Sequence, residues 1–302
     1  MATTGTIGVL ETQASEALRP RQPRAFTILR LVRQNPLGFL GLIIILTLAF
    51  TAAFAPWIAP YEVGEYRAAE VRENPSMDHF FGTDGTGRDV FSRVVSGARI
   101  SMGVAFLSVI GGTGVALVLG IFSGYIGGTL DNLIQRMVDT ALAFPQLLFL
   151  LILAQVLGAS FNTVVLAIGI SIIAPVTRVV RGAVLSEQNN QYVEAARALG
   201  ASTPRILFVH IAPNIFALAI IVATTLLGIA ILAEASLSFL GLGIPVPNPS
   251  WGTDINLARN TRPYHIPWAF FPGLAITLTV LGFNLLGDSL RDILDPRLRG
   301  RL

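Results

Sequence analysis

Long stretches without a charged residue alternate with short polar segments along this chain. The first stretch covers residues 37–55 and is bounded by Pro36 and Pro56. A helix of this length crosses the ~30 Å hydrocarbon core of a bilayer. Four further apolar stretches follow, and the longest, 140–177, is divided by a break between Gly158 and Asn162. The pattern predicts six transmembrane helices, at about residues 37–55, 100–126, 140–158, 162–180, 215–237 and 266–287.

The composition agrees with this pattern. The 302 residues are 53% hydrophobic and only 13% charged, with a mean hydropathy of +0.66. In soluble domains roughly a quarter of the residues are charged. We therefore expect an all-α integral membrane protein that is surrounded by a lipid bilayer.

Residue types that the chain lacks exclude several kinds of chemistry. It contains no cysteine, which rules out disulfides, thiolate nucleophiles and cysteine metal sites. Its three histidines, His79, His210 and His265, fall in separate segments, so we expect no metal site. All 21 basic residues are arginine, whereas a phosphate-binding P-loop requires a lysine. Any ATP that serves this protein must therefore be hydrolysed by another polypeptide.

The arginines also predict the orientation of the helices. Fourteen of the 21 lie before Pro36, between residues 178 and 205, after residue 289, or at Arg136. The positive-inside rule places these segments in the cytoplasm, and six spans put both termini there. Residues 57–99 combine five arginines with seven acids and should lie outside. Because the arginines are dispersed and lack interleaved aromatic residues, the pI of 9.8 reflects topology and we expect no nucleic-acid binding.

This orientation divides the chain into four parts. They are a cytoplasmic tail (1–36), the first span with its outer loop (37–99), a five-span core with a cytoplasmic segment at 182–214 (100–288), and a second tail (289–302). A cleaved signal is the alternative for the first span, because Ala53-Phe-Ala55 has the small-x-small form of a cleavage site. The apolar run is longer than a signal core and Pro56 would follow the cut, so we expect a retained helix.

The cytoplasmic segment contains the most informative pattern, Glu194-Ala-Ala-Arg-Ala-Leu-Gly200. Helical periodicity puts small apolar residues on one face and charged residues on the other. A small apolar face lets another backbone approach closely, which suits docking into a groove on a partner protein. A helix lying on the membrane surface is the alternative, but such helices carry larger apolar residues. One face comprises Tyr192, Ala195, Ala196 and Leu199, and the other comprises Glu194, Arg197 and Ala201.

Two short helices are predicted within this segment. The first covers about residues 189–199 and ends at Gly200, which suits a left-handed C-terminal position. Thr203 is expected to cap the second helix, with Pro204 at its first helical position. This second helix should continue towards Pro213.

Small residues recur every four positions in the second predicted span. Such a stripe lets two helices pack closely. It fits packing within this chain's own bundle, and it equally fits an interface with another subunit. The stripe comprises Gly112, Ala116, Gly120 and Gly124.

The spacing of Glu194-Ala-Ala, Gly200 and His210-Ile-Ala-Pro213 resembles the EAA loop of permease subunits of ABC importers. The family usually has leucine where this chain has Ala212, which weakens one packing contact. In that family the loop forms a cytoplasmic coupling helix that inserts into a cleft of the ATPase subunit. The resemblance therefore implies that ATPase coupling involves Tyr192, Glu194, Ala195, Ala196, Arg197, Leu199, Gly200, Ile211 and Pro213.

Three further blocks resemble the C-type permease of the dipeptide/oligopeptide (peptide/nickel) importers. They begin at Phe81-Gly-Thr-Asp, Glu234-Ala-Ser and Leu290-Arg-Asp, and Pro249-Ser-Trp-Gly252 follows the second. The resemblance covers nearly everything from Leu29 onward. It implies a type I ABC importer permease fold, with one N-terminal span ahead of a five-span core, in the cytoplasmic (inner) membrane of a prokaryote.

The same resemblance implies partners and cargo. A second permease subunit, two ATPase subunits and an extracytoplasmic substrate-binding protein would complete the transporter. No cofactor is expected on this chain, because ATP and Mg²⁺ belong to the ATPase subunits. The cargo would be di- or oligopeptides, with nickel, opines or oligosaccharides as alternatives.

Two rival classes of protein fit the residues less well. An ion-coupled secondary transporter should carry ionisable residues along its spans, and Glu234 is nearly the only one. An intramembrane enzyme would need a nucleophile and a base, and the chain has no serine/histidine pair at a recognisable spacing.

Glu234, near the outer end of the fifth predicted span, is also a candidate functional residue. Intramembrane acids usually face a cavity, so Glu234 with Ser236 and Ser238 is a candidate for the translocation path or gate. The alternative is a structural carboxylate that is bonded to neighbouring hydroxyl groups such as that of Ser236.

The remaining candidates are structural or contact residues. Arg88, Asp89 and Arg93 favour a locally paired structural face, and Asp288 with Arg291 and Asp292 should orient the end of the sixth span. The glycine stripe is a candidate for permease–permease packing. Candidate contacts for the binding protein are Pro249, Trp251 and Gly252.

Overall fold

The computed structural model describes residues 35–261 and 263–294, so eight of the nine arginines in the two predicted tails lie outside it. The described ranges are almost entirely helical, and their one β feature is an isolated bridge between Thr83 and Asp89. In chain order the elements are α3 (Pro36–Ala53), α4 (Ala55–Ile58), η1 (Ala68–Glu70), α5 (Val90–Ile126), α6 (Gly128–Leu142), α7 (Gln146–Leu157), α8 (Phe161–Glu187), α9 (Gln191–Ala198), α10 (Thr203–Arg205), η2 (Ile206–Ile211), α11 (Ala212–Phe239), α12 (Trp251–Asn260) and α13 (Ile266–Leu294).

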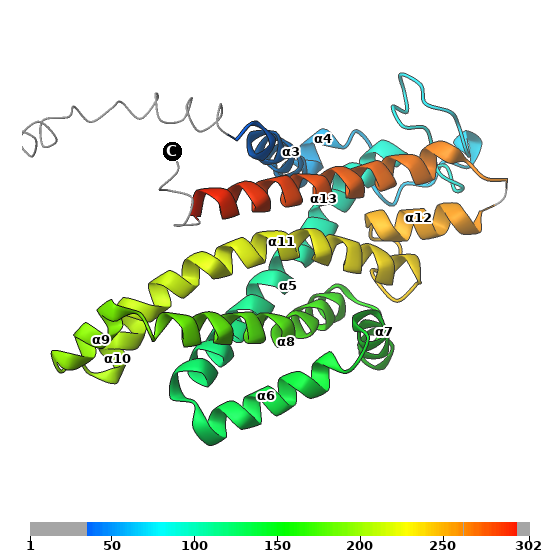
Figure 1. Ribbon diagram of the computed structural model, residues 1–302. Coiled ribbons are helices and arrows are strands. Elements are labelled where there is room, and N and C mark those ends of the chain that lie inside the picture. Colours follow the sequence, from blue (N-terminus) through cyan, green and yellow to red (C-terminus); the bar gives the residue numbers. More distant parts are fainter. Residues whose placement is uncertain (1–34, 262, 295–302) are drawn as a thin grey trace, which may run out of the picture.

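The long helices form an elongated bundle with different structures at its two ends (Figure 1). The helix α5 crosses the bundle and packs on α8, α11 and α3, while α3 also packs along α13. The short helices α9 and α10 lie at one end, and α12 lies with the segment between α4 and α5 at the other (Figure 1). We call these the α9 end and the α12 end.

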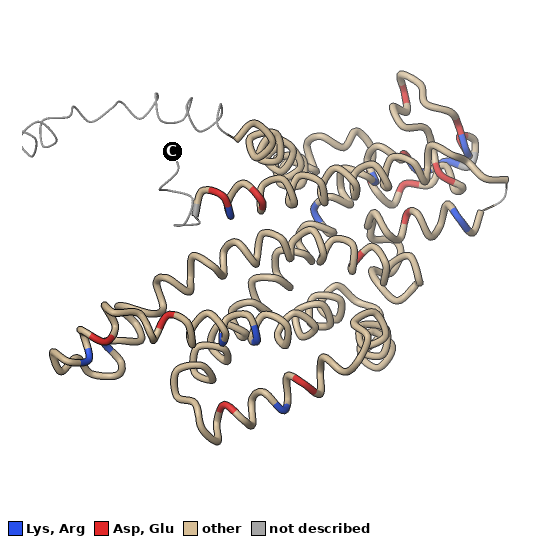
Figure 2. The backbone as a smooth tube through the Cα atoms, in the orientation of Figure 1, with Lys and Arg blue, Asp and Glu red and all other residues tan. Residues whose placement is uncertain are grey.

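Five of the helices are long and apolar enough to cross a membrane: Pro36–Ala53, Val90–Ile126, Phe161–Glu187, Thr203–Phe239 and Ile266–Ile293. A sixth crossing is obtained when the bent pair α6 and α7 is taken as one span. Figure 2 shows no charge along α3 and α7, whereas charged residues gather at the two ends and along α6. The all-helical membrane architecture that the sequence predicts is confirmed.

The second span begins ten residues before the predicted boundary, at Val90 instead of Ile100. Asp89 caps it, because the Asp89 carboxylate accepts a hydrogen bond from the backbone N–H of Ser92 at 2.7 Å. Arg93 made this stretch resemble a loop, but its charge is buried and paired with Asp254. A tertiary ion pair therefore admits a charge that periodicity alone would exclude from the helix.

The third span is not the single helix that was predicted at 140–158. Residues 128–142 form α6, residues 146–157 form α7, and the two helices meet at an angle of 89°. Pro145 lies at the corner, where it lacks an N–H group and also restricts the preceding residue. The polar side of α6 packs on α8, where Arg181 donates two hydrogen bonds of 2.6 Å to Asp131.

The fifth span also begins earlier than predicted, because α10, η2 and α11 form one helical run from Thr203 to Phe239. The second short helix of the cytoplasmic segment is therefore the start of this span. Ser202, and not Thr203, occupies the N-cap position, with no side-chain capping bond. The π-helical turn η2 ends two residues before Pro213, whose missing N–H removes an ordinary helical bond to the Val209 carbonyl.

The stripe of small residues on α5 packs against α8 of the same chain. A Cβ atom at Gly120 would lie 2.7 Å from the side chain of Val180 and 2.9 Å from the Thr177 carbonyl oxygen. Gly112 and Gly124 meet α8 in the same way, and Ala116 is buried. Of the two interpretations of the stripe, the structure shows packing within this chain's own bundle. A surface that α8 already covers is not free to contact a second permease.

Candidate functional site

The helix α9 is held between the ends of the two long helices α8 and α11. Asn214, at the start of α11, donates hydrogen bonds to Glu187 Oε1 at 2.8 Å and to the Tyr192 hydroxyl oxygen at 2.9 Å. The Tyr192 hydroxyl in turn donates to the same Glu187 oxygen. Because Glu187 is the last residue of α8 and Tyr192 lies in α9, this network joins three helices.

The pKa of Tyr192 is raised above its usual value by partial burial of the hydroxyl and by the neighbouring Glu187 carboxylate. The hydroxyl therefore stays protonated throughout the physiological pH range and remains a hydrogen-bond donor to Glu187. This contact joins α9 to both α8 and α11.

Val193 packs α9 against the hydrophobic core of the bundle. Its side chain is 0% exposed and belongs to the hydrophobic core that also contains Val184, Ile206 and Ile211. It is the one buried residue of α9. The sequence reading missed this residue, as well as the roles of Glu187 and Asn214. The available signal was Val193 itself, the one large aliphatic side chain among the alanines of this helix.

The opposite side of α9 is open. Leu199 is 89% exposed, and Tyr192 is also exposed. Gly200 ends the helix with a φ of +78°, as its predicted left-handed position requires. The N–H of Ala201 then donates to the Ala196 carbonyl oxygen at 3.0 Å, which closes the helix end. Leu199 therefore leaves apolar surface on α9 that the described chain does not cover.

Most of the nine residues that the resemblance assigned to coupling lie on this accessible side. Glu194, Ala195, Arg197 and Pro213 are exposed, and Ala196 is half-buried. Neither Glu194 nor Arg197 forms an ion pair with another described residue, so both charges are available to a partner. Ile211 differs from the rest, because it is fully buried and supports α9 from within the chain.

A cavity of about 910 Å³ lies beside α9, between α11 and α13. Glu187 and Asn214 line it on the α9 side, and Asp288 and Arg291 line it at the end of α13. The polar residues at the end of the sixth span therefore face the same space as the network that holds α9.

At the α12 end, a buried ion pair and a buried indole tie α12 to α5. Arg93 Nε donates to Asp254 Oδ1 at 2.8 Å, and both side chains are only 1% exposed. The indole N–H of Trp251 donates to the backbone carbonyl oxygen of Val94 at 3.0 Å. Gly97 leaves space for this ring, because a Cβ there would lie 3.2 Å from the indole.

The prediction that a substrate-binding protein contacts Pro249, Trp251 and Gly252 does not agree with where these residues lie. All three are buried, and Trp251 is 0% exposed. The backbone of Gly252 packs on α11, where a Cβ would come within 2.5 Å of the Ala235 carbonyl oxygen. A binding protein cannot reach side chains that this chain itself covers. Exposed residues do lie nearby, in the loop before α12 at Val246, Pro247 and Asn248.

Glu234 is buried completely inside the chain. The Ser238 hydroxyl donates to Glu234 Oε1 at 2.8 Å, whereas the Ser236 hydroxyl donates to the Leu232 carbonyl oxygen at 2.7 Å. Ser238, one helical turn further along α11, is therefore the hydroxyl partner of the carboxyl group. This packing matches the structural alternative for Glu234 more closely than a residue that faces a cavity.

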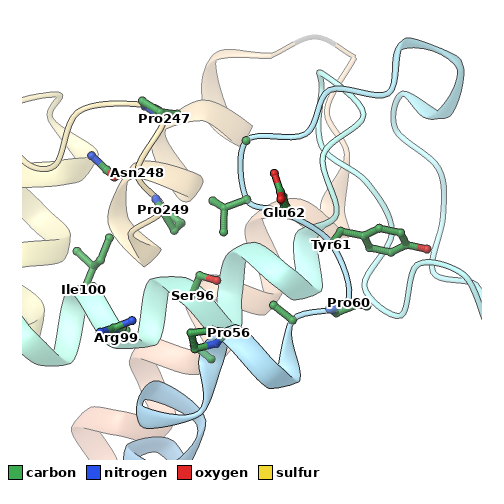
Figure 3. A pocket seen from close by; sticks show the side chains of 14 residues that line it. Pro56, Pro60, Tyr61, Glu62, Ser96, Arg99, Ile100, Pro247, Asn248 and Pro249 are labelled. Carbon is green, nitrogen blue, oxygen red and sulfur yellow. The ribbon is translucent and has the colours of Figure 1, made fainter.

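A second cavity, of about 680 Å³, opens at the α12 end (Figure 3). Ser96 and Arg99 project into it from α5, Glu62 lies in the segment after α4, and Pro247 and Pro249 form the wall next to α12 (Figure 3).

The segment between α4 and α5 is organised around a buried histidine. His79 Nδ1 lies 2.9 Å from Asp89 Oδ1, and His79 Nε2 lies 3.0 Å from Glu70 Oε2. Burial disfavours the charged ring, but the hydrogen bonds with Asp89 and Glu70 together outweigh it and raise the pKa of His79. Arg88 donates to Asp84 at 2.8 Å. Arg88 and Asp89 are therefore paired within this segment, as predicted, whereas Arg93 pairs with Asp254 of α12.

Two family models match the chain. Residues 116–300 match the binding-protein-dependent transport system inner membrane component, and residues 27–75 match the N-terminal transmembrane domain of oligopeptide transport permease C. The first match contains α9 and the helices that hold it.

Curated proteins of known name are similar over most of their length. The dipeptide transport system permease protein DppC of Alkalihalophilus pseudofirmus is 41% identical over 89% of this chain and 88% of its own length. The oligopeptide transport system permease protein OppC of Bacillus subtilis is 40% identical over 88% of each chain. The glutathione transport system permease protein GsiD of Pectobacterium atrosepticum is 40% identical over 89% of this chain and 90% of its own. The chain therefore belongs to the family of binding-protein-dependent transport system inner membrane components and has the type I permease fold of that family.

Proposed function

We propose that this chain is one of two permease subunits of an importer that carries di- or oligopeptides across the cytoplasmic membrane. The observation that carries the proposal is the exposed side of α9, with Leu199 at its tip, held by hydrogen bonds between α8 and α11. The names of the similar permeases support peptides as the cargo, since they include dipeptide, oligopeptide and glutathione transport.

The α9 end faces the cytoplasm in this proposal, because Arg197 and Arg205 lie in its short helices α9 and α10 and the positive-inside rule places such arginines in the cytoplasm. An ATPase subunit docks on α9, and it binds and hydrolyses ATP with Mg²⁺, because this chain has no lysine for a P-loop. The α12 end faces outward. A substrate-binding protein docks there on exposed residues such as Val246 and Asn248.

The transport mechanism in this proposal depends on the hydrogen bonds that hold α9 between α8 and α11. When the two ATPase subunits close on ATP, they displace α9, and the Glu187–Tyr192–Asn214 network passes this displacement to α8 and α11. These helices run from the α9 end through the bundle as long continuous units. ATP binding therefore favours one of two packings of the bundle, and α9 carries that preference into the membrane.

The cargo assignment is tested by uptake into proteoliposomes that contain the complete transporter. We expect a labelled tripeptide to enter only when both its binding protein and ATP are present. Nickel, an opine and an oligosaccharide serve as competitors, and none should reduce tripeptide uptake. Uptake driven by an ion gradient without ATP, or competition by one of the alternative cargoes in place of peptides, would overturn the assignment.

A further inference from the structure

The corner between α6 and α7 leaves polar backbone at a depth where lipid does not tolerate it. Ser171 of α8 lies opposite the corner, since the Gln146 side chain donates to the Ser171 hydroxyl oxygen at 3.5 Å. Ser171 is ten residues from the first residue of α8, or about 15 Å at 1.5 Å per residue. With the first residue of α8 taken as one boundary of the ~30 Å hydrocarbon core, the corner lies near the middle of that core.

Nothing in the described chain covers this corner. All ten residues from 139 to 148 are exposed, and residues 143–145 are outside helical structure. The first turn of α7 leaves N–H groups without helical acceptors. In hydrocarbon each unsatisfied peptide group costs several kcal/mol, so broken backbone at this depth is found only within protein or beside a water-filled cavity.

Two more polar features lie on the same side. Pro175 lies inside α8 and cannot donate to the Ser171 carbonyl oxygen, which therefore lacks its ordinary helical partner at the level of the corner. One face of α8 carries both Ser171 and Arg178, seven residues apart. Arg178 forms an ion pair with Asp139 of α6, and the two side chains are 50% and 55% exposed. An ion pair this exposed is unfavourable against lipid tails and favourable beside water.

We propose that the α6–α7 corner, residues 139–148, lines the water-filled substrate path, and that Gln146 offers hydrogen bonds there to the amide groups of the passing solute. A carboxamide has both a donor and an acceptor, as a peptide group does, and it carries no charge. Contacts of this kind accept peptides irrespective of their side chains. The inference rests on the proposed function and specifies where the path runs and which chemical groups it recognises.

The absence of cysteine from the chain makes a direct test available, because each introduced cysteine is the only thiol in this subunit. Gln146→Cys is prepared in the assembled transporter, in membrane vesicles of both orientations, and is treated with a charged, membrane-impermeant thiosulfonate. Leu166→Cys is the control, since Leu166 is 55% exposed on α8 but lies about 140° around the helix from Ser171.

We expect Gln146→Cys to react with the charged reagent at least about tenfold faster than Leu166→Cys, which should react only with a lipid-soluble maleimide. Substrate-loaded binding protein and a non-hydrolysable ATP analogue should change the Gln146→Cys rate. If Gln146→Cys does not assemble, Thr140→Cys, which is also exposed in this corner, replaces it. A corner cysteine that resists the charged reagent in every nucleotide state would overturn the proposal, whether lipid or a second permease covers it.

The amide contact is tested separately by Gln146→Leu. We expect a several-fold slower tripeptide uptake, with unchanged affinity of the peptide for the binding protein; unchanged uptake would overturn the amide contact. Tripeptide uptake by the unmodified chain in the same vesicles separates this inference from the proposed function. Labelling of the corner without any peptide uptake would refute the proposal that peptides are the cargo. Peptide uptake without labelling would refute the proposal that the corner lines the substrate path.

Discussion

Arg93 and Asp254 form an ion pair inside the protein, with 2.8 Å between Arg93 Nε and Asp254 Oδ1. The two residues are 161 positions apart in the sequence, and each side chain is only 1% exposed. Arg93 lies in the first turn of α5 and Asp254 in the first turn of α12. The pair therefore fixes α12 on the helix that crosses the centre of the bundle.

Breaking this pair from one side should be costly. Asp254→Ala leaves the Arg93 charge buried without its partner, and we expect a loss of about 3–5 kcal/mol in unfolding free energy. The double replacement Arg93→Met with Asp254→Leu removes both charges and should be markedly less destabilising. Thermal unfolding of the detergent-solubilised transporter measures both. Equal destabilisation by the single and the double replacement would contradict the account.

Trp251 should act through stability and not through contact with the binding protein. Trp251→Ala removes a fully buried ring and its hydrogen bond to Val94, and we expect a loss of about 3–5 kcal/mol. Asn248→Ala, in the exposed loop three residues earlier, should leave the unfolding transition unchanged and weaken the stimulation of ATPase activity by the binding protein. The reverse pattern, with Trp251→Ala stable and unresponsive to the binding protein, would restore the contact interpretation.

His79 should make the segment between α4 and α5 more stable in mildly acidic solution. The groups that face its ring are Asp89 and Glu70, and Glu70 also meets Arg67. Because the folded-state pKa of His79 is raised above the unfolded value near ~6.5, its stabilisation is fully present below that value. The stabilisation is lost as the pH rises through the raised folded pKa.

Proteolysis of this segment at a series of pH values measures the effect. We expect cleavage between α4 and α5 to accelerate from pH 6 to pH 9, relative to a reference site elsewhere in the chain. His79→Asn should remove the pH dependence. A wild-type segment that becomes more resistant as the pH rises would show that the protonated ring does not stabilise it.

Much of the fold follows from the sequence, because apolar stretches, prolines and capping residues act locally. The predicted end of α9 at Gly200 is confirmed by its positive φ, since only glycine adopts that conformation without cost. The start of α5 was predicted too late, because Arg93 is neutralised by a residue that is distant in the sequence. The corner at Pro145 was missed, because apolarity was read as one continuous span and α6 is amphipathic.

In the candidate sites, too, local sequence patterns were informative and contacts between distant residues were missed. Periodicity predicted an apolar and a charged face on α9, but residues of both faces are exposed and Val193, which was assigned to neither, is buried. The residues that hold α9 come from three helices and show no common sequence pattern. The block around Trp251 was assigned to a partner contact although it packs inside the chain. A motif indicates that residues are needed together, but burial decides whether they serve packing or contact.

In the proposed mechanism α9 transmits the action of a separate ATPase, and Leu199 and Val193 offer a matched pair of residues to test this role. Leu199→Asp places a charge on the exposed side, and we expect an unchanged unfolding transition because nothing in the described chain packs on this tip. Val193→Ala removes buried packing, and we expect a loss of about 1–2 kcal/mol in stability with the ATPase contact surface left intact.

The most direct measurement is the amount of ATPase that co-purifies with the Leu199→Asp chain, combined with ATP-driven peptide uptake by the same preparation. We expect ATPase retention and uptake both to fall at least about tenfold, while the variant inserts and unfolds as the unmodified chain does. Full ATPase retention with full uptake would contradict this role, because the exposed side of α9 would then not be the surface on which the ATPase acts.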